Sequence, residues 1–179
     1  MVTILVTGFE PFGNDDANPS ADAVRALASR WRGDDELVTE VLPVAFERGA
    51  ARVRELITTH RPTIVLAVGL GGGRAAVGVE RVAINLKDAR IPDNDGDQPI
   101  DVPSIDGAPP AYFATIAVKA TAAAINEAGI DAEISYTAGT FVCNHVMFEA
   151  LDAATDGVRA GLVGWLLTCP VAGRHCLLL

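Results

Sequence analysis

Cys143 is the side chain in this sequence that most resembles a catalytic nucleophile. It lies in the stretch AGTFVCNHVMFEAL, residues 138–151, after small residues and before a helical pattern of apolar ones. A cysteine at the start of a helix faces free backbone amides and the positive end of the helix dipole. These groups lower the pKa of its thiol and can stabilise an oxyanion. A small buried side chain without a chemical role is the alternative interpretation, and this stretch alone leaves both open.

Alternating strand and helix patterns around this cysteine predict the fold. Buried apolar or alternating runs predict strands at 2–7, 36–44, 63–70, 77–86, 131–139 and 159–171. Amphipathic patterns predict helices at 20–31, 46–60, 112–129 and 144–156. Residues 88–111, dense in Asp, Pro and Gly, predict a long functional loop. This order predicts an α/β fold with a largely parallel sheet, in which ligands bind at the carboxyl ends of strands.

Composition and charge argue against several classes of protein. The formal net charge of −9 argues against a nucleic-acid partner. No run of about 18 apolar residues is present, so no membrane partner is expected. The N-terminal apolar run ends at Gly8 without a basic segment, which is not the pattern of a signal peptide. Three cysteines without such a signal indicate reduced thiols and a cytoplasmic protein.

Other motifs do not carry a competing chemistry. The stretch GLGGGR, residues 69–74, lacks the spacing of a dinucleotide-binding loop and precedes a second predicted strand rather than a helix. Cys143 and His145 have no accompanying ligand cluster, so a structural zinc site is not predicted. No G-x-S-x-G elbow is present, which argues against a serine hydrolase.

Three separated stretches resemble pyroglutamyl peptidase I, also called pyrrolidone-carboxylate peptidase, a family of cytosolic cysteine peptidases. They are LVTGFEPFGNDDANPS, GRAAVGVERVAINLKDARIPDNDGDQPI and SYTAGTFVCNHVMFEAL, in order between residues 3 and about 165. The resemblance implies a three-layer α/β/α sandwich with a mostly parallel, mixed and twisted sheet, as one peptidase-like domain over residues 1–179. It also implies removal of N-terminal pyroglutamate from peptides, no cofactor, and a homo-oligomer.

The resemblance implies catalytic roles residue by residue. Cys143 matches the family nucleophile, Glu80 the acid that orients the catalytic histidine, and Arg90 an arginine near the oxyanion. In such a mechanism the thiolate attacks the carbonyl, an imidazole protonates the leaving amine, and the carboxylate fixes the imidazole tautomer. The alternative for Glu80 is a surface residue paired with Arg81 or Arg52. For Arg90 the alternative is a salt bridge within the acidic loop.

The family pocket for pyroglutamate is apolar and clamps a flat, neutral lactam between aromatic rings. Asn18 resembles a residue that supports the N-terminal loop beside this pocket, and Leu70 replaces a glutamine found in many members. Core packing is the default interpretation of a phenylalanine, but the GFEPFG loop holds two of them in a polar turn. The remaining matching positions are Phe9, Phe12, Ile91, Phe141 and Val142.

The catalytic histidine of the family has no counterpart at the matching position. Thr168 stands there, and from about residue 165 the sequence diverges and ends early. Threonine is not a general base near neutral pH. His145 lies two residues after the nucleophile, about 200° around the helix axis, and is expected to face away. His60 ends a predicted helix, so His175 in the divergent tail remains as a substitute base.

Two functional hypotheses follow from this pattern. One is an active omega-peptidase, and the other is a truncated, inactive relative that still binds pyroglutamyl termini. A nucleoside-phosphorylase-like enzyme is a third, by analogy of layered architecture alone. Codons for Leu-Thr-Cys-Pro, residues 167–170, can encode His-X-Pro when read one base earlier. We therefore hypothesise a shift of reading frame near residues 164–168.

Overall fold

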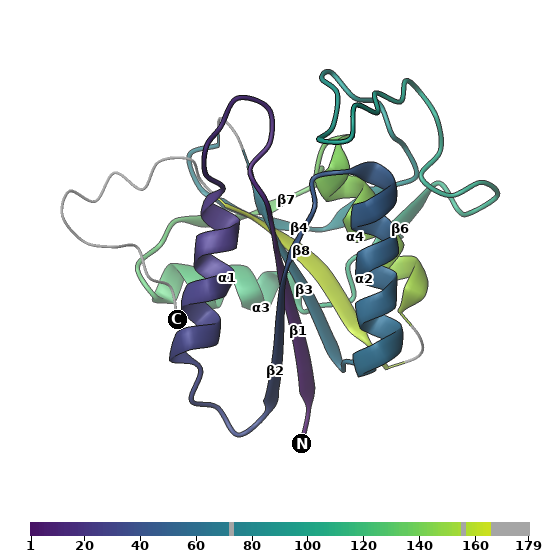
Figure 1. Cartoon of the computed structure of the whole chain (residues 1–179). Helices are drawn as coiled ribbons and strands as arrows, with labels where there is room; N and C mark the ends of the chain where they lie inside the picture. Colours follow the sequence, from purple (N-terminus) through teal and green to yellow (C-terminus); the bar gives the residue numbers. More distant parts are fainter. Residues whose placement is uncertain (72–73, 155–156, 166–179) are drawn as a thin grey trace.

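A six-stranded mixed sheet lies between two layers of helices in the computed structural model, which describes residues 1–71, 74–154 and 157–165 (Figure 1). The sheet order is β2-β1-β3-β8-β4-β7. Its strands are β1 (Thr3–Phe9), β2 (Glu36–Leu42), β3 (Ile64–Leu70), β4 (Val77–Glu80), β7 (Ala132–Ser135) and β8 (Arg159–Trp165). The helices are α1 (Pro19–Arg30), α2 (Phe46–His60), α3 (Val118–Glu127) and α4 (Val142–Ala153). The predicted three-layer α/β architecture is confirmed.

Strand direction makes the sheet mixed. β1 runs parallel to β2 and β3, β3 runs parallel to β8, and β4 runs parallel to β7. β4 and β8 are antiparallel, with Gly78 opposite Gly164 and Val79 opposite Val163. Gly164 is also paired with Gly69 of β3, so the three glycines lie side by side on three neighbouring strands. This register lies close to the carboxyl ends of β3 and β8, where the expected site should be.

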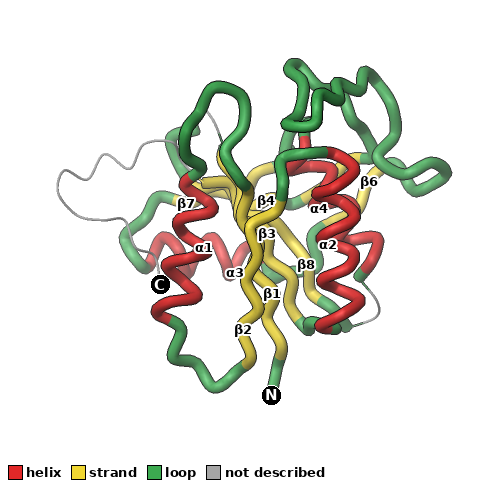
Figure 2. The backbone as a smooth tube through the Cα atoms, in the orientation of Figure 1, coloured by secondary structure: helices red, strands yellow, loops and turns green. Residues whose placement is uncertain are grey.

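Helices α2 and α4 cover one face of the sheet, and α1 and α3 cover the other (Figures 1 and 2). The larger apolar core lies under α2 and α4 and includes Leu5, Phe46, Val53 and Phe148. A smaller one lies under α3. Helix α4 is buried on nearly all sides, because α2, the sheet and a small second sheet surround it.

The second sheet corrects two of the predicted elements. The predicted strand 77–86 is two strands, because the chain leaves the main sheet after Glu80 and forms β5 (Val82–Ile84). β5 pairs antiparallel with β6 (Ala111–Phe113), which occupies the start of the predicted helix 112–129. The buried side chain of Asn144 explains the departure, since its amide exchanges hydrogen bonds of 3.0 and 2.8 Å with the backbone of Ile84.

The long acidic loop before β6 is anchored to α2 and lies above α2 and α4 in Figure 2. Asp93 is buried, and its Oδ2 accepts a hydrogen bond of 2.8 Å from the backbone N–H of Phe46, the first residue of α2. Its Oδ1 accepts from the N–H groups of Asp95 and Asp97, and Arg48 pairs with the Asp95 carboxylate. The aspartates therefore hold the loop by capping a helix whose own N-cap residue offers no side-chain bond.

Every helix in the described ranges is too short or too polar to cross a membrane. The predicted strand 159–171 is described as far as Trp165, and its later residues lie outside the described ranges.

Asn18 joins the loop after β1 to the start of α1. Its Oδ1 accepts hydrogen bonds from the backbone N–H and the hydroxyl of Ser20, at 3.1 and 2.8 Å. Its Nδ2 donates to the carbonyl of Glu10 at 2.9 Å, and the Ser20 hydroxyl accepts from the N–H of Phe9. One buried side chain thus serves as helix cap and loop clamp.

We expect Asn18→Ala to lower the free energy of unfolding by about 2 kcal/mol, because it removes a cap and leaves buried polar partners unpaired. Urea unfolding monitored by circular dichroism measures the change. Ser29→Ala on the exposed side of α1, whose hydroxyl bonds only to Ala26, is the matched control. Equal stability of the two variants would contradict the clamp.

Candidate active site

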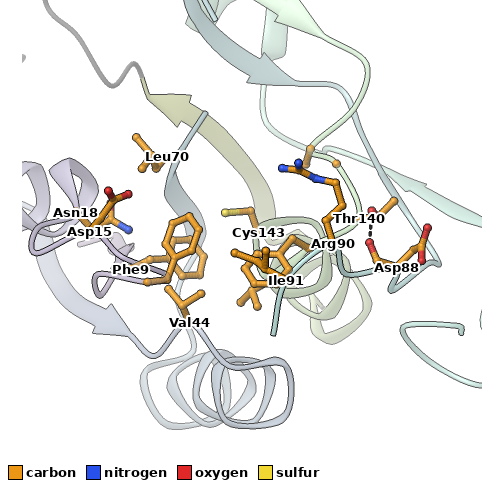
Figure 3. Close-up of a pocket in the computed structure, with 15 residues that line it drawn as sticks. Phe9, Asp15, Asn18, Val44, Leu70, Asp88, Arg90, Ile91, Thr140 and Cys143 are labelled. Atoms are coloured by element: carbon orange, nitrogen blue, oxygen red, sulfur yellow. Dashed lines mark hydrogen bonds between the residues drawn. The ribbon is translucent and has the colours of Figure 1, made fainter. Parts of the chain in front are cut away.

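A pocket of about 380 Å³ opens between the carboxyl end of β3, the N-terminus of α4 and the loops after β1 and β5 (Figure 3). Its lining brings together predicted residues that are far apart in the sequence. They are Phe9, Phe12, Asn18, Arg90, Ile91, Phe141, Val142 and Cys143. Glu80 is the predicted site residue of the described ranges that does not line the pocket.

Cys143 is the second residue of α4, and this half-buried residue has a free thiol and lines the pocket. The backbone amides of Leu70 and of Cys143 itself favour the thiolate. Burial, followed by the negative charge of Glu80, outweighs them and raises the pKa of the Cys143 thiol to about 12. The expectation that the helix N-terminus gives a lowered pKa is therefore wrong, because desolvation and a nearby carboxylate outweigh the two amide hydrogen bonds.

Glu80 is buried at the end of β4, with 1% of its surface exposed. Burial raises the pKa of its carboxyl, while the Ser135 hydroxyl and the guanidinium of Arg74 act in the opposite direction. Arg74 Nη1 lies 3.0 Å from Glu80 Oε1. Glu80 Oε2 has no hydrogen-bond partner among the residues that the structure describes. A carboxylate oxygen held in this way is available to an N–H donor.

The alternative interpretation of Glu80 as a surface residue is wrong. Arg52, one of the partners considered, pairs instead with Glu40 at 3.2 Å and with Glu55 at 2.8 Å. Glu80 faces the same side of the sheet as Gly78, Gly164 and α4. A carboxylate on this side is enclosed, whereas one on a solvent-facing strand would be hydrated.

A row of three glycines lets the thiol and the acid approach the sheet. A Cβ at Gly69 would lie 3.0 Å from Cys143 Sγ, and one at Gly164 would lie 3.4 Å from Glu80 Oε1. A Cβ at Gly78 would lie 1.9 Å from Arg74 Nη1. Because these glycines are paired across β3, β8 and β4, their missing side chains leave a continuous space beside the pocket.

Aromatic rings form one wall of the pocket and continue into the core. The rings of Phe12 and Phe141 are 5.9 Å apart, and Phe141 meets Phe46 edge-on at 5.4 Å. Phe9 is almost fully buried and serves both the core and the pocket floor. Ile91 is 42% exposed and adds an aliphatic side chain to the lining, near Cys143 in Figure 3. The pocket is thus a slot with apolar walls.

Arg90 reaches over the pocket from the acidic loop, with its guanidinium on the side of Cys143 (Figure 3). Ion pairs formed within the described ranges do not include Arg90, so the alternative of a salt bridge in its own loop is not observed there. A cation at this place favours a negatively charged group near Cys143.

His145 faces away from the pocket, as its position two residues after Cys143 predicts. It is 2% exposed, its Nε2 lies 3.8 Å from Glu149 Oε1, and its ring packs on Phe46. Burial, with smaller contributions from Lys87 and Arg54, lowers the pKa of His145 to about 4. It is a neutral core residue and not a base for Cys143.

The other histidines do not supply a base within the described ranges. His60 lies in the last turn of α2, as predicted. His175 and Thr168 lie outside the described residues.

Arg74 and Asn144 are residues of the site region that sequence reasoning missed. Arg74 is the last residue of the GLGGGR motif, which was interpreted by the spacing of its glycines alone. Asn144 stands next to Cys143 in the quoted motif, and its buried amide sets the path of β5 behind the pocket. Val44, Asp15 and Asp88 also line the pocket, and no pattern in the sequence pointed to them.

Known proteins are similar to this chain in both sequence and fold. The family model described as pyroglutamyl peptidase matches residues 2–171. The pyrrolidone-carboxylate peptidase of Escherichia fergusonii is 52% identical over 165 residues, or 91% of this chain and 77% of that one. That of Clavibacter michiganensis is 48% identical over 165 residues, with coverage of 91% and 78%.

Solved structures with a similar fold have the same kind of name as these relatives. The crystal structure of pyroglutamyl peptidase I from Bacillus amyloliquefaciens has a TM-score of 0.88 and 40% identity, over 93% of this chain and 82% of that one. Pyrrolidone carboxyl peptidase from Thermococcus litoralis has a TM-score of 0.89 and 39% identity, with coverage of 94% and 78%. The fold and the thiol at a helix start are those of an α/β cysteine peptidase. The chain belongs to the pyroglutamyl peptidase family.

We expect Gly69→Ala to displace the Cys143 sulfur by a few tenths of an ångström, since the new methyl group would lie 3.0 Å from it. The rate of Cys143 alkylation by iodoacetamide should fall by about threefold or more, because a displaced sulfur loses part of the Leu70 amide hydrogen bond that favours the thiolate. Gly164→Ala, whose methyl group would make an ordinary contact at 3.4 Å, is the control and should lose far less. Equal rates in Gly69→Ala and the unchanged protein would show that the close approach has no effect on the thiol.

Proposed function

We propose that this chain is a cysteine omega-peptidase that removes pyroglutamate from the N-terminus of peptides, with Cys143 as the nucleophile. The observation that carries the proposal is the free cysteine Cys143 in the lining of a pocket of about 380 Å³ with apolar walls. That volume suits a small ligand, and aromatic and aliphatic walls suit a flat, neutral lactam. Membership of the pyroglutamyl peptidase family supports the same substrate.

In the proposed reaction the Cys143 sulfur attacks the carbonyl carbon of the peptide bond that follows the pyroglutamyl residue, not the lactam carbonyl. The backbone amides of Leu70 and Cys143 stabilise the attacking sulfur as a thiolate, and we propose the guanidinium of Arg90 as the group that faces the developing oxyanion. The base takes the proton of the thiol and gives it to the peptide amine, which leaves as the C–N bond breaks and a thioester remains. Water, deprotonated by the same base, then hydrolyses the thioester to free pyroglutamate, and the proton returns to the Cys143 sulfur. We propose Phe9, Phe12, Asn18, Ile91, Phe141 and Val142 as the residues that form or support the substrate pocket.

A base is required because the pKa of the Cys143 thiol is raised to about 12, which leaves little thiolate at neutral pH. We propose that Glu80 orients this base through Oε2, which has no partner in the described ranges. His60 and His145 are placed elsewhere, so His175 is the proposed substitute. Binding without turnover is the second candidate function, and Thr168 at the matching position favours it.

We further propose that the chain is one peptidase-like domain over residues 1–179 that acts in the cytoplasm as a homo-oligomer on pyroglutamyl peptides. The odd number of cysteines and the acidic composition support a reducing, intracellular setting. Large exposed apolar side chains, such as Ile100 at 72% and Phe113 at 71%, support self-association.

Hydrolysis of a chromogenic pyroglutamyl amide tests the proposal. We expect the 179-residue chain to release the chromophore, and Cys143→Ser to lower kcat by about 10³-fold or more. Cys169→Ser is the matched control, because it removes a thiol that has no proposed role. A prolyl amide, which lacks the lactam carbonyl, should not be cleaved.

The contrary outcomes separate the two candidate functions. If no chromophore is released but a pyroglutamyl ligand protects Cys143 from alkylation, the chain binds without catalysis. If the ligand gives no protection either, both candidate functions fail.

A further inference from the structure

Arg74 lies between the buried carboxylate of Glu80 and the wall of the pocket. Its Nη1 is 3.0 Å from Glu80 Oε1, and its Nη2 donates a hydrogen bond of 2.7 Å to the carbonyl of Thr137. Glu80 belongs to β4, whereas Thr137 belongs to the loop between β7 and α4. One guanidinium therefore joins two segments that meet only in the folded chain.

The sheet provides the space that this guanidinium occupies. A Cβ at Gly78 would lie 1.9 Å from Arg74 Nη1, and one at Gly164 would lie 3.8 Å from it. Neither glycine has a positive φ that would demand glycine for its backbone. The absence of side chains at this register thus serves the approach of Arg74 and Glu80 rather than a turn.

Thr137, which accepts the hydrogen bond from Arg74, directly precedes the segment that forms one wall of the pocket. Ser135 and Thr137 exchange hydrogen bonds of 3.2 and 3.3 Å, and Thr137 Oγ1 accepts from the N–H of Gly139 at 3.0 Å. Residues 138–143, which follow directly, line the pocket and end at the thiol. A change at the Thr137 carbonyl is therefore passed to the segment that carries Cys143.

Planar guanidinium chemistry suits this position. An arginine presents several N–H donors in a fixed plane and can contact a carboxylate and a carbonyl together, whereas a lysine is a single point charge. A carboxylate enclosed like that of Glu80 is costly to ionise without such a partner. The cation is thus positioned to keep the buried acid charged.

We propose that Arg74 is a positioning residue that holds Glu80 ionised through Oε1, leaves Oε2 for the base, and ties the acid to the pocket wall at Thr137. The part that concerns the base rests on the proposed function of Glu80. Arg74 acts on the thiol through Glu80, whose charge raises the pKa of Cys143.

Thiol reactivity gives a test that does not require turnover. The rate at which methyl methanethiosulfonate modifies Cys143 is measured from pH 6 to pH 9 in a Cys169→Ser, Cys176→Ser background. In Arg74→Met the pKa of Glu80 should rise further, so at the acidic end of this range a larger fraction of the carboxyl is protonated and it opposes the thiolate less. We expect a rate about three- to tenfold above that of the unchanged protein at pH 6, and equal rates at pH 9.

A double-mutant cycle shows whether the effect passes through Glu80. Glu80→Gln should raise the rate at both pH values, and adding Arg74→Met to it should change nothing further. Arg74→Lys keeps the charge and should match the unchanged protein at pH 6, but it should weaken protection by a pyroglutamyl ligand because the Thr137 contact is lost. Arg81→Met removes a neighbouring arginine as the matched control and should leave all rates unchanged.

Three results would overturn the proposal. One is an unchanged rate at pH 6 in Arg74→Met, and another is an equal change at all pH values that persists in the Glu80→Gln background. The third is a dependence of the Cys143 modification rate on pH that is the same in Arg74→Lys as in Glu80→Gln. This result can be obtained even if Arg74→Met fails to fold. Absence of turnover in the unchanged protein would count against the peptidase function. The double-mutant cycle would still test the role of Arg74, because it measures thiol modification and not turnover.

Discussion

The arrangement of the site depends on one steric constraint, the row of glycines at a single register of the sheet. Gly69, Gly164 and Gly78 are paired across β3, β8 and β4 and face α4. A side chain at Gly69 would crowd the Cys143 sulfur at the start of α4, and one at Gly78 would collide with Arg74, the partner of Glu80. With only backbone at this register, the thiol lies against β3 and the acid against β8, on the same face. The pocket then forms where α4 begins, walled by loops that strands and helices fix from both sides.

Close approach has an electrostatic consequence, because it removes water from both ionisable groups. Burial raises the pKa of Cys143 and that of Glu80, and the Glu80 charge adds to the effect on the thiol. The site therefore does not store a thiolate by itself. It holds a neutral nucleophile beside a charged acid and requires a base to couple the two. This is why the identity of the residue that meets Glu80 Oε2 decides between catalysis and binding.

The sequence predicted more of the site than of its surroundings. Cys143, the pocket phenylalanines and Asn18 lie in compact motifs, so local spacing and family resemblance were sufficient to group them. The split of 77–86 was not visible, because Val and Ile alternate on both sides of Glu80 and only the distant Asn144 redirects the chain. The direction of the pKa shift of the Cys143 thiol could not be predicted from the sequence either, since it depends on burial and on a carboxylate 63 positions away in the sequence. Arg74 joins segments whose proximity only the fold creates.

The central claim is that the pocket recognises a pyroglutamyl group and presents its carbonyl to Cys143. Peptide mass mapping after treatment with the chloromethyl ketone of L-pyroglutamate tests this most directly. The account predicts a single adduct on Cys143, formed much faster than with the D-enantiomer or with the proline analogue. Labelling spread evenly over Cys143, Cys169 and Cys176, or equal rates for the three reagents, would contradict it.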